Sequence, residues 1–256
     1  MNNFKKIGMT ALAASLVSTS VFAGEMSVAG SASINFENHS HAALSEAKTF
    51  SMGNQLTFSG SGELDNGMTV SLSFVLDQGD DATTGLTYAP FDSHSVTISS
   101  DAMGTLKFSG EGGASATSAI GGTVGGNMWD NFNSNGGTTV SNSASGNNSF
   151  YYTLPTMGDS GVGVNASYKP QTTSTSSSMG LAVSYTGVEG LTLNYASTDI
   201  ETPQTATTGD ETAWKASYAV GSFTLAASNV SYDLGGTASD QEVDSYKVSY
   251  SVTDDF

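Results

Sequence analysis

Residues 54–77 of the chain read NQLTFSGSGELDNGMTVSLSFVLD, and this stretch decides the fold. Between Met68 and Asp77, apart from Val75, apolar side chains alternate with small polar ones. Successive side chains of a β-strand point to opposite faces of the sheet, so the alternation predicts a strand with one apolar and one polar face. The Asp-Asn-Gly at residues 65–67 favours a tight turn, because these residue types tolerate a positive φ. The stretch is therefore a predicted β-hairpin.

The same rhythm recurs along the chain, and short turns alternate with long polar loops. We predict twelve strands, at residues 26–36, 49–64, 68–77, 93–100, 105–111, 149–155, 162–169, 179–185, 191–197, 212–220, 223–229 and 245–252. Turns are expected at residues 65–67, 101–104, 156–161, 186–190 and 221–222. Long loops are expected near residues 37–48, 78–92, 112–148, 170–178, 198–211 and 230–244. This spacing predicts an all-β, antiparallel, up-and-down transmembrane β-barrel in which every second connection is an external loop.

The N-terminal segment has the pattern of a secretory signal peptide. Two lysines precede the mostly apolar residues 7–20, and small or modest side chains stand before a cleavage point between Ala23 and Gly24. A transmembrane helix is the alternative, but the apolar part is too short to cross about 30 Å of hydrocarbon. We therefore expect residues 1–23 to be removed during export through the periplasm, and residues 24–256 to form one barrel domain.

Composition excludes several classes of function. The seven basic residues are all lysines, and removal of Lys5 and Lys6 with the signal leaves 5 lysines against 24 acids, a net charge of −19. Nucleic acid is not an expected partner, because its binding depends on basic side chains that neutralise phosphates. The chain has no cysteine, which excludes disulfides and thiolate chemistry.

Charge placement is a test of the membrane barrel, although the strands of a secreted soluble β-sandwich would also alternate. The signal peptide, the alternating connection lengths and aromatic residues near strand ends favour the barrel. A basic residue on the lipid-facing parity costs roughly 2 to 4 kcal/mol at mid-membrane. The strand lysines Lys107, Lys215 and Lys247 all have the polar parity. The acids expected at strand ends on the inward register are Glu37, Glu63, Asp77 and Glu111. We expect nearly all other acids in loops or turns, so that the outward parity is free of charge.

One connection is much longer than the others. It follows the fifth predicted strand, runs from Gly112 to Asn148 and has a glycine-rich first part. A structureless loop of this length in a compact domain is usually functional or disordered. Two interpretations are open: a flexible external loop, or a segment that folds into the barrel and narrows its channel.

Three stretches resemble the general trimeric porins of Gram-negative outer membranes. They are residues 54–77, the Gly-Thr-Leu at residues 104–106, and the segment NSFYYTLP at residues 148–155. The resemblance implies a sixteen-stranded barrel in the cell outer membrane whose third external loop, after strand five, forms the constriction. It also implies passive diffusion of small hydrophilic solutes and inorganic ions, a homotrimer in contact with outer-membrane lipid and lipopolysaccharide, and no cofactor.

Departures from the family pattern bear on ion selectivity. Gln55 and Tyr151 occupy positions where the family commonly has arginines opposite acids on the loop, and this chain has no arginine. With Asp130 and Glu111 near the expected constriction and Lys107 as the counter-charge, we predict a channel that prefers cations or neutral solutes, because acids in a low-dielectric lumen focus negative potential. The alternative is a nearly neutral lumen, with loop acids that are solvated or bind divalent ions bridging lipopolysaccharide.

Trp129 lies in the same long loop and has two interpretations. It stacks with solutes at the constriction, or it anchors the folded loop against the barrel wall. An indole ring combines a large apolar surface with one N–H donor, which suits either role. The expected residues of the constriction and pore lining are Gln55, Lys107, Glu111, Trp129, Asp130 and Tyr151.

No catalytic pattern is convincing, and we expect no enzyme and no metal site. His39, His41 and His94 are the candidates for a Ser-His pair, but they lie in or beside predicted loops amid many serines. His39 and His41 lack a clear third zinc ligand, and the acids of residues 77–81 and 240–244 match no EF-hand loop. A non-conducting outer-membrane barrel that acts as an adhesin or structural surface protein is the alternative function, and conductance separates it from a porin.

The C-terminus bears on the completeness of the barrel. Outer-membrane barrels usually end in an aromatic residue, and the last residue of this sequence is Phe256. Residues 253–255 (Thr-Asp-Asp), however, resemble another tight turn. The resemblance to sixteen-stranded porins leads us to expect a barrel that is incomplete at this end, and a complete twelve-stranded barrel is the alternative. An open sheet would expose two unpaired edges, which is costly in lipid.

Overall fold

The computed structural model describes residues 26–39, 47–77, 92–120, 124, 144–172, 176–201, 209–234 and 240–252. The strands of this part form one sheet of twelve, in which the hydrogen-bonded order follows the chain from β1 to β12. The predicted all-β, antiparallel, up-and-down architecture is confirmed. The expected signal peptide, residues 1–23, lies outside the described residues.

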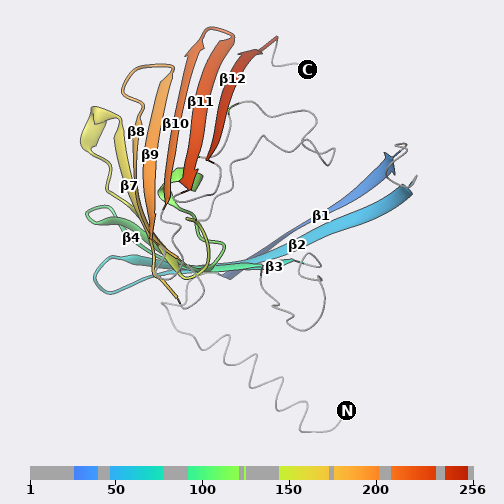
Figure 1. Ribbon diagram of the computed structural model, residues 1–256. Coiled ribbons are helices and arrows are strands. Elements are labelled where there is room, and N and C mark those ends of the chain that lie inside the picture. Colours follow the sequence, from blue (N-terminus) through green and yellow to red (C-terminus); the bar gives the residue numbers. More distant parts are fainter. Residues whose placement is uncertain are drawn as a thin grey trace. The chain divides into compact units, whose positions relative to one another are not determined.

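The chain divides into two compact units, Met1–Ile98 and Ser99–Phe256, and the boundary falls inside β4. The first unit contains β1 (Met26–His39), β2 (Ala47–Glu63), β3 (Thr69–Asp77) and most of β4 (Ser93–Ser100). The second contains β5 (Gly104–Glu111), β6 (Ser149–Thr153), β7 (Val162–Lys169), β8 (Ser177–Tyr185), β9 (Leu191–Glu201), β10 (Gly209–Val220), β11 (Phe223–Leu234) and β12 (Gln241–Tyr250). Within this unit β7 to β12 lie side by side (Figure 1). Each predicted strand is present.

Glycines with a positive φ make the short turns. In the turn between β2 and β3, Gly67 has a φ of 78°. Its amide donates to the Leu64 carbonyl at 2.8 Å, and the Leu64 amide donates to the Met68 carbonyl at 2.7 Å. A side chain with a Cβ atom would be strained at this φ, so glycine is the residue that suits the position. Gly104 has the same φ at the start of β5, directly after the turn at residues 101–103, and both predicted turns are confirmed.

Within the described part of the chain, two short helical segments lie between strands. The helix α2 (Ala116–Ala119) belongs to the long connection between β5 and β6. The 3-10 turn η1 (Gly158–Ser160) connects β6 to β7. Among the described residues, no helix has the length and the apolar character needed to cross a membrane.

In the second unit the strand register separates two faces. Val164, Val183, Tyr195 and Trp214 lie in one row across β7 to β10, on what we call the apolar face. Three of them expose 39 to 54% of their surface, as expected for side chains that face outward from a membrane sheet. Ser184 follows Val183 in the chain and lies on the opposite side, which we call the polar face.

The strand lysines obey the predicted parity. Lys107 of β5 pairs with Tyr151 of β6, and Lys215 of β10 pairs with Ser228 of β11. Lys247 of β12 also falls on the polar face, by its pairing with β11. The apolar face of the described strands therefore carries none of these three charges.

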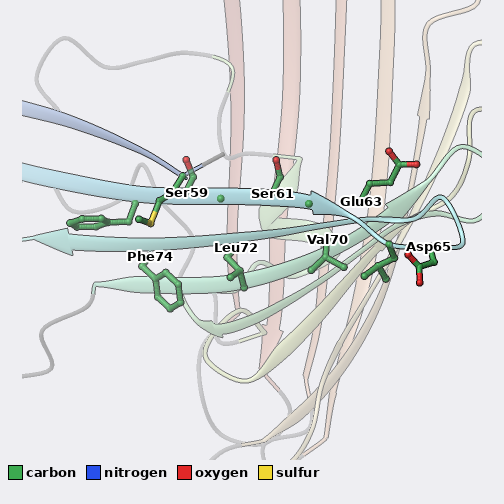
Figure 2. Close-up of a pocket in the computed structure, with 12 residues that line it drawn as sticks. Ser59, Ser61, Glu63, Asp65, Val70, Leu72 and Phe74 are labelled. Atoms are coloured by element: carbon green, nitrogen blue, oxygen red, sulfur yellow. The ribbon is translucent and has the colours of Figure 1, made fainter. Parts of the chain in front are cut away.

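The first unit has the same two-faced character. Figure 2 shows Ser59 and Ser61 of β2 on one side of the sheet, and Leu72 and Phe74 of β3 on the other. On the polar side, the hydroxyls of Ser27 and Ser59 are 2.8 Å apart and hydrogen-bonded. On the apolar side, Leu72 and Phe74 line a hollow.

Seven strands, β1, β2 and β8 to β12, extend further than predicted into regions assigned to loops. We predicted that β9 would end at residue 197 and that β10 would begin at residue 212, whereas they end and begin at Glu201 and Gly209. The added residues continue the ladder, and Asp210 pairs with Asp199 on one side and Asp233 on the other. The assignment of these acids to loops was wrong, because backbone pairing continues beyond the point where apolar alternation ends.

The extension also places acids on the apolar-face parity. On β12, Glu242 and Asp244 share this parity with Tyr246 and Val248. The Asn229 amide donates to one carboxylate oxygen of each, at 2.8 and 3.0 Å. The expectation that the outward parity is free of charge is therefore wrong for these strands. The acids occupy the first half of β12, next to the connection from β11, and the apolar side chains occupy the second half. Only the second half of the strand therefore needs to face lipid.

Candidate functional site

The long connection between β5 and β6 is described at both of its ends. We call residues 112–120 the entry limb and residues 144–148 the exit limb. The Gly146 amide donates to the Gly113 carbonyl at 3.0 Å, which joins the limbs near their base. The two ends of the segment are therefore hydrogen-bonded to each other where it leaves β5 and returns to β6.

The entry limb forms α2 with the help of a reciprocal cap. The Ser115 hydroxyl accepts from the Ser118 amide at 3.1 Å, and the Ser118 hydroxyl accepts from the Ser115 amide at 2.8 Å. Such a capping box satisfies two amides that a helix N-terminus leaves without a partner. In the second unit, α2 packs against β7, β8, β9 and β10 (Figure 1).

Beneath α2, one register row of the polar face supplies the hydrogen-bond partners. We call it the glutamate row, and its members on β7 to β10 are Ser167, Gly180, Thr198 and Glu211. The Ala116 amide donates to the Ser167 hydroxyl at 2.9 Å. The Thr117 hydroxyl lies 3.2 Å from the Thr198 hydroxyl and donates to the Glu211 carboxylate at 2.7 Å. Every residue of the row except the glycine thus bonds the entry limb.

Gly180 lets α2 approach the sheet. A Cβ atom at this position would collide with the Ala116 methyl group and the Thr198 hydroxyl. Beside the row, Ala182 and Ala196 pack with Ala116 in a buried cluster. Small side chains on β8 and β9 therefore make the room that the helix occupies.

The exit limb lies over the neighbouring row of the same face. The Ser178 hydroxyl donates to the Ala144 carbonyl at 2.8 Å, and the Lys169 ammonium donates to the Ser145 carbonyl at 3.3 Å. Ala144 also packs against Ile200 in a second buried cluster. The two limbs are therefore docked on adjacent rows of one sheet face.

Two charged side chains lie beneath the docked limbs. Glu211 is 3% exposed and Lys169 is 7% exposed. The Glu211 carboxylate accepts from the Thr117 hydroxyl and, at 3.4 Å, from the Ala144 amide. Lys169 lies within electrostatic range of Glu211. A buried carboxylate is costly unless its oxygens accept hydrogen bonds and a positive charge lies nearby, and Glu211 has both.

Three of the predicted lining residues are described by the structure in the second unit. Lys107 and Tyr151 are cross-strand neighbours on the polar face of β5 and β6. Glu111 ends β5 on the same parity, where the entry limb begins. Lys107 is exposed, whereas Glu111 and Tyr151 are partly buried. The structure therefore brings Lys107 and Tyr151 together and places Glu111 next to the docked segment.

Of the other three predicted residues, the structure describes one, which belongs to the first unit. Gln55 belongs to β2 in the first unit, where it pairs with Ser31 and Asp77. Trp129 and Asp130 lie outside the described residues. Within the described part of the chain, no three His, Cys, Asp or Glu side chains lie close enough together to hold a metal ion.

Sequence reasoning missed the residues that hold the long connection. Glu211 was assigned to a loop because the predicted strand began one residue later. A usable signal was nevertheless present on β8, where the polar-parity positions Ser178, Gly180 and Ala182 are all small. A glycine inside a strand often marks a site where another backbone approaches closely. Such a run therefore predicts that another segment packs on this face.

Gly180→Ala tests the close approach of α2. We expect the collision to lower the free energy of unfolding by roughly 1 to 3 kcal/mol and to speed chymotrypsin cleavage within residues 112–148. Gly163→Ala is the matched control on β7, because its new methyl group would meet only the Ser184 side chain. Urea unfolding in lipid vesicles and timed proteolysis measure both variants. Equal behaviour of the two would contradict the docking of α2 over Gly180.

The fold is similar to those of solved outer-membrane porins. The chain matches a loop L8 deletion mutant of OmpT, an outer membrane protein of Vibrio cholerae, with a TM-score of 0.61 and 12% identity, over 90% of this chain and 78% of that one. It matches a refined porin structure with a TM-score of 0.60 and 18% identity, over 86% and 76% of the two chains. It matches an anion-selective porin from Comamonas acidovorans with a TM-score of 0.54 and 18% identity, over 88% of this chain and 73% of that one. At these identities the likeness shows the fold.

The family assignment comes from the sequence as a whole. No curated protein matches the chain significantly. The family model described as Gram-negative porin matches residues 8–255, nearly the entire chain. The chain therefore belongs to the family of Gram-negative porins and is an outer-membrane β-barrel channel.

Proposed function

We propose that the chain forms a water-filled channel for passive diffusion of small hydrophilic solutes and ions, and that the segment of residues 112–148 narrows it. The observation that carries the proposal is the docking of α2 on the polar face, through the bond from Thr117 to Glu211. The polar face of a porin sheet lines the channel. A segment that covers this face occupies part of the channel's cross-section.

Ala119→Trp tests the narrowing. Ala119 ends α2 and is exposed, so a large ring there would extend from the docked helix into the channel. We expect a lower single-channel conductance in planar bilayers. Ala102→Trp is the matched control, because Ala102 is exposed in the turn between β4 and β5. An unchanged conductance of A119W would contradict the narrowing, and a wild-type protein without conductance would contradict the channel and favour an adhesin.

We also propose that the channel prefers cations. The support is the excess of acids over lysines in the chain, with Glu111 at the start of the long connection and Asp130 in its sequence as the acids expected to act on passing ions. Exposed or partly buried lysines of the polar face, such as Lys107 and Lys215, oppose this preference, so we expect a modest one. The Comamonas acidovorans porin is described as anion-selective, and the fold alone therefore does not set the sign.

Reversal potentials across a potassium chloride gradient measure the preference. The wild type should show a cation-to-anion permeability ratio above one, and Lys107→Glu should raise the ratio, because it replaces an exposed positive charge of the polar face by a negative one. Glu189→Lys, in the exposed turn between β8 and β9, is a control of equal charge change and should have a smaller effect. A clear anion preference of the wild type would overturn the proposal.

Assembly and export complete the proposed function. We infer a homotrimer in outer-membrane lipid and lipopolysaccharide, exported through the periplasm with removal of residues 1–23. Family membership supports the trimer, and the N-terminal sequence pattern supports the cleavage. Cross-linking in detergent should give a three-subunit species, and the mature protein should begin at Gly24. A cross-linked species no larger than a dimer would contradict the homotrimer. An uncleaved N-terminus would contradict the removal of residues 1–23.

A further inference from the structure

The Glu211 side chain contacts both limbs of the long connection. One carboxylate oxygen accepts from the Thr117 hydroxyl of the entry limb at 2.7 Å, and the other accepts from the Ala144 amide of the exit limb at 3.4 Å. The partners are far apart along the connection but meet at one buried group. Ser167 and Ser178 each bond one limb, so Glu211 differs from them by joining two.

We propose that Glu211 is the positioning residue that holds the two limbs together on the polar face and thereby sets the open width of the channel. The proposal rests on the proposed function, because it assumes that the docked segment narrows a conducting pore. Glu211 itself is buried beneath the segment and does not touch the solute. Its effect on conduction acts through the position of the limbs.

The geometry requires a carboxylate in particular. Both oxygens of Glu211 are acceptors, which suits a hydroxyl donor on one side and an amide donor on the other. A glutamine can accept from only one of them, and its amide nitrogen would then face a second donor. The Lys169 ammonium lies within electrostatic range of the Glu211 carboxylate and offsets its negative charge. Glu211→Gln is therefore a nearly isosteric change that removes one half of the attachment.

Loss of one charge-assisted hydrogen bond should shift the ratio of docked to undocked limbs by roughly tenfold to a hundredfold. We expect Glu211→Gln to raise the single-channel conductance and to add current fluctuations on the time scale of loop motion. Removal of a negative charge alone has the opposite sign, because it lowers the conductance of a cation-preferring channel. The direction of the change therefore separates loop release from simple electrostatics.

A reversible cross-link tests the same point without relying on charge. The hydroxyls of Thr117 and Thr198 are 3.2 Å apart, so cysteines at both positions would bring two sulfur atoms within reach of a disulfide. The chain has no cysteine of its own, which makes the pair selective. In an E211Q background, oxidised T117C/T198C should return the conductance to the wild-type value, and reduction should raise it again.

A second cysteine pair provides the matched control. The hydroxyls of Ser27 and Ser59 are also hydrogen-bonded, at 2.8 Å, but they join β1 to β2 in the first unit. Oxidised S27C/S59C should leave the high conductance of E211Q unchanged. If oxidation of T117C/T198C fails to lower the conductance of E211Q, the effect does not come from the limbs and the proposal is overturned.

Failure of this proposal is distinguishable from failure of the channel function. A wild-type protein that conducts, together with an E211Q variant of equal conductance and equal chymotrypsin resistance, would overturn the role of Glu211 alone. A wild-type protein without conductance would overturn the proposed function and this inference with it. Faster cleavage of E211Q within residues 112–148, with a raised conductance, supports both.

Discussion

Backbone hydrogen bonding in lipid is the constraint on which the structure depends. Each N–H and C=O group that crosses the hydrocarbon layer needs a partner, because an unsatisfied group costs several kcal/mol there. The antiparallel ladder from β1 to β12 supplies these partners and imposes a side-chain period of two. The period sends Val183 to one face and Ser184 to the other. The surface on which α2 docks is a product of this register.

The long connection is held to that surface by contacts of a different kind. Its hydrogen bonds to the sheet include bonds between side-chain hydroxyls of the sheet and backbone groups of the segment, as in the bonds from Ala116 to Ser167 and from Ser178 to Ala144. Serine and threonine satisfy buried backbone groups without adding charge, so they can face either water or a docked segment. Glu211 adds the charged contact, and Lys169 balances it. Packing against alanines then fixes the distance between helix and sheet.

Much of the fold could be predicted from alternation and turn residues, because both are local properties of the sequence. The outer ends of β9 and β10 could not, because polar residues such as Asp199 and Asp210 remove the apolar signal while the backbone ladder continues. The predicted start of β10 was three residues too late, and this error hid Glu211. The helix α2 has four residues, too few to show a helical period, and its position depends on partners far away in the sequence. Lys107 was predicted as a counter-charge on a strand, and Tyr151 was predicted from the resemblance to the family pattern; the structure pairs the two across β5 and β6.

The glutamate row is assembled from four separate strands, and this has a consequence for the order of folding. The Ala116 amide bonds a residue 51 positions later in the chain, and the Thr117 hydroxyl bonds one 94 positions later. Neither partner is in place until β7 to β10 have paired, and closing such distant contacts early would cost chain entropy without reward. Docking of the segment is therefore a late event in folding. A newly inserted barrel should pass through a wider form before it reaches its final bore.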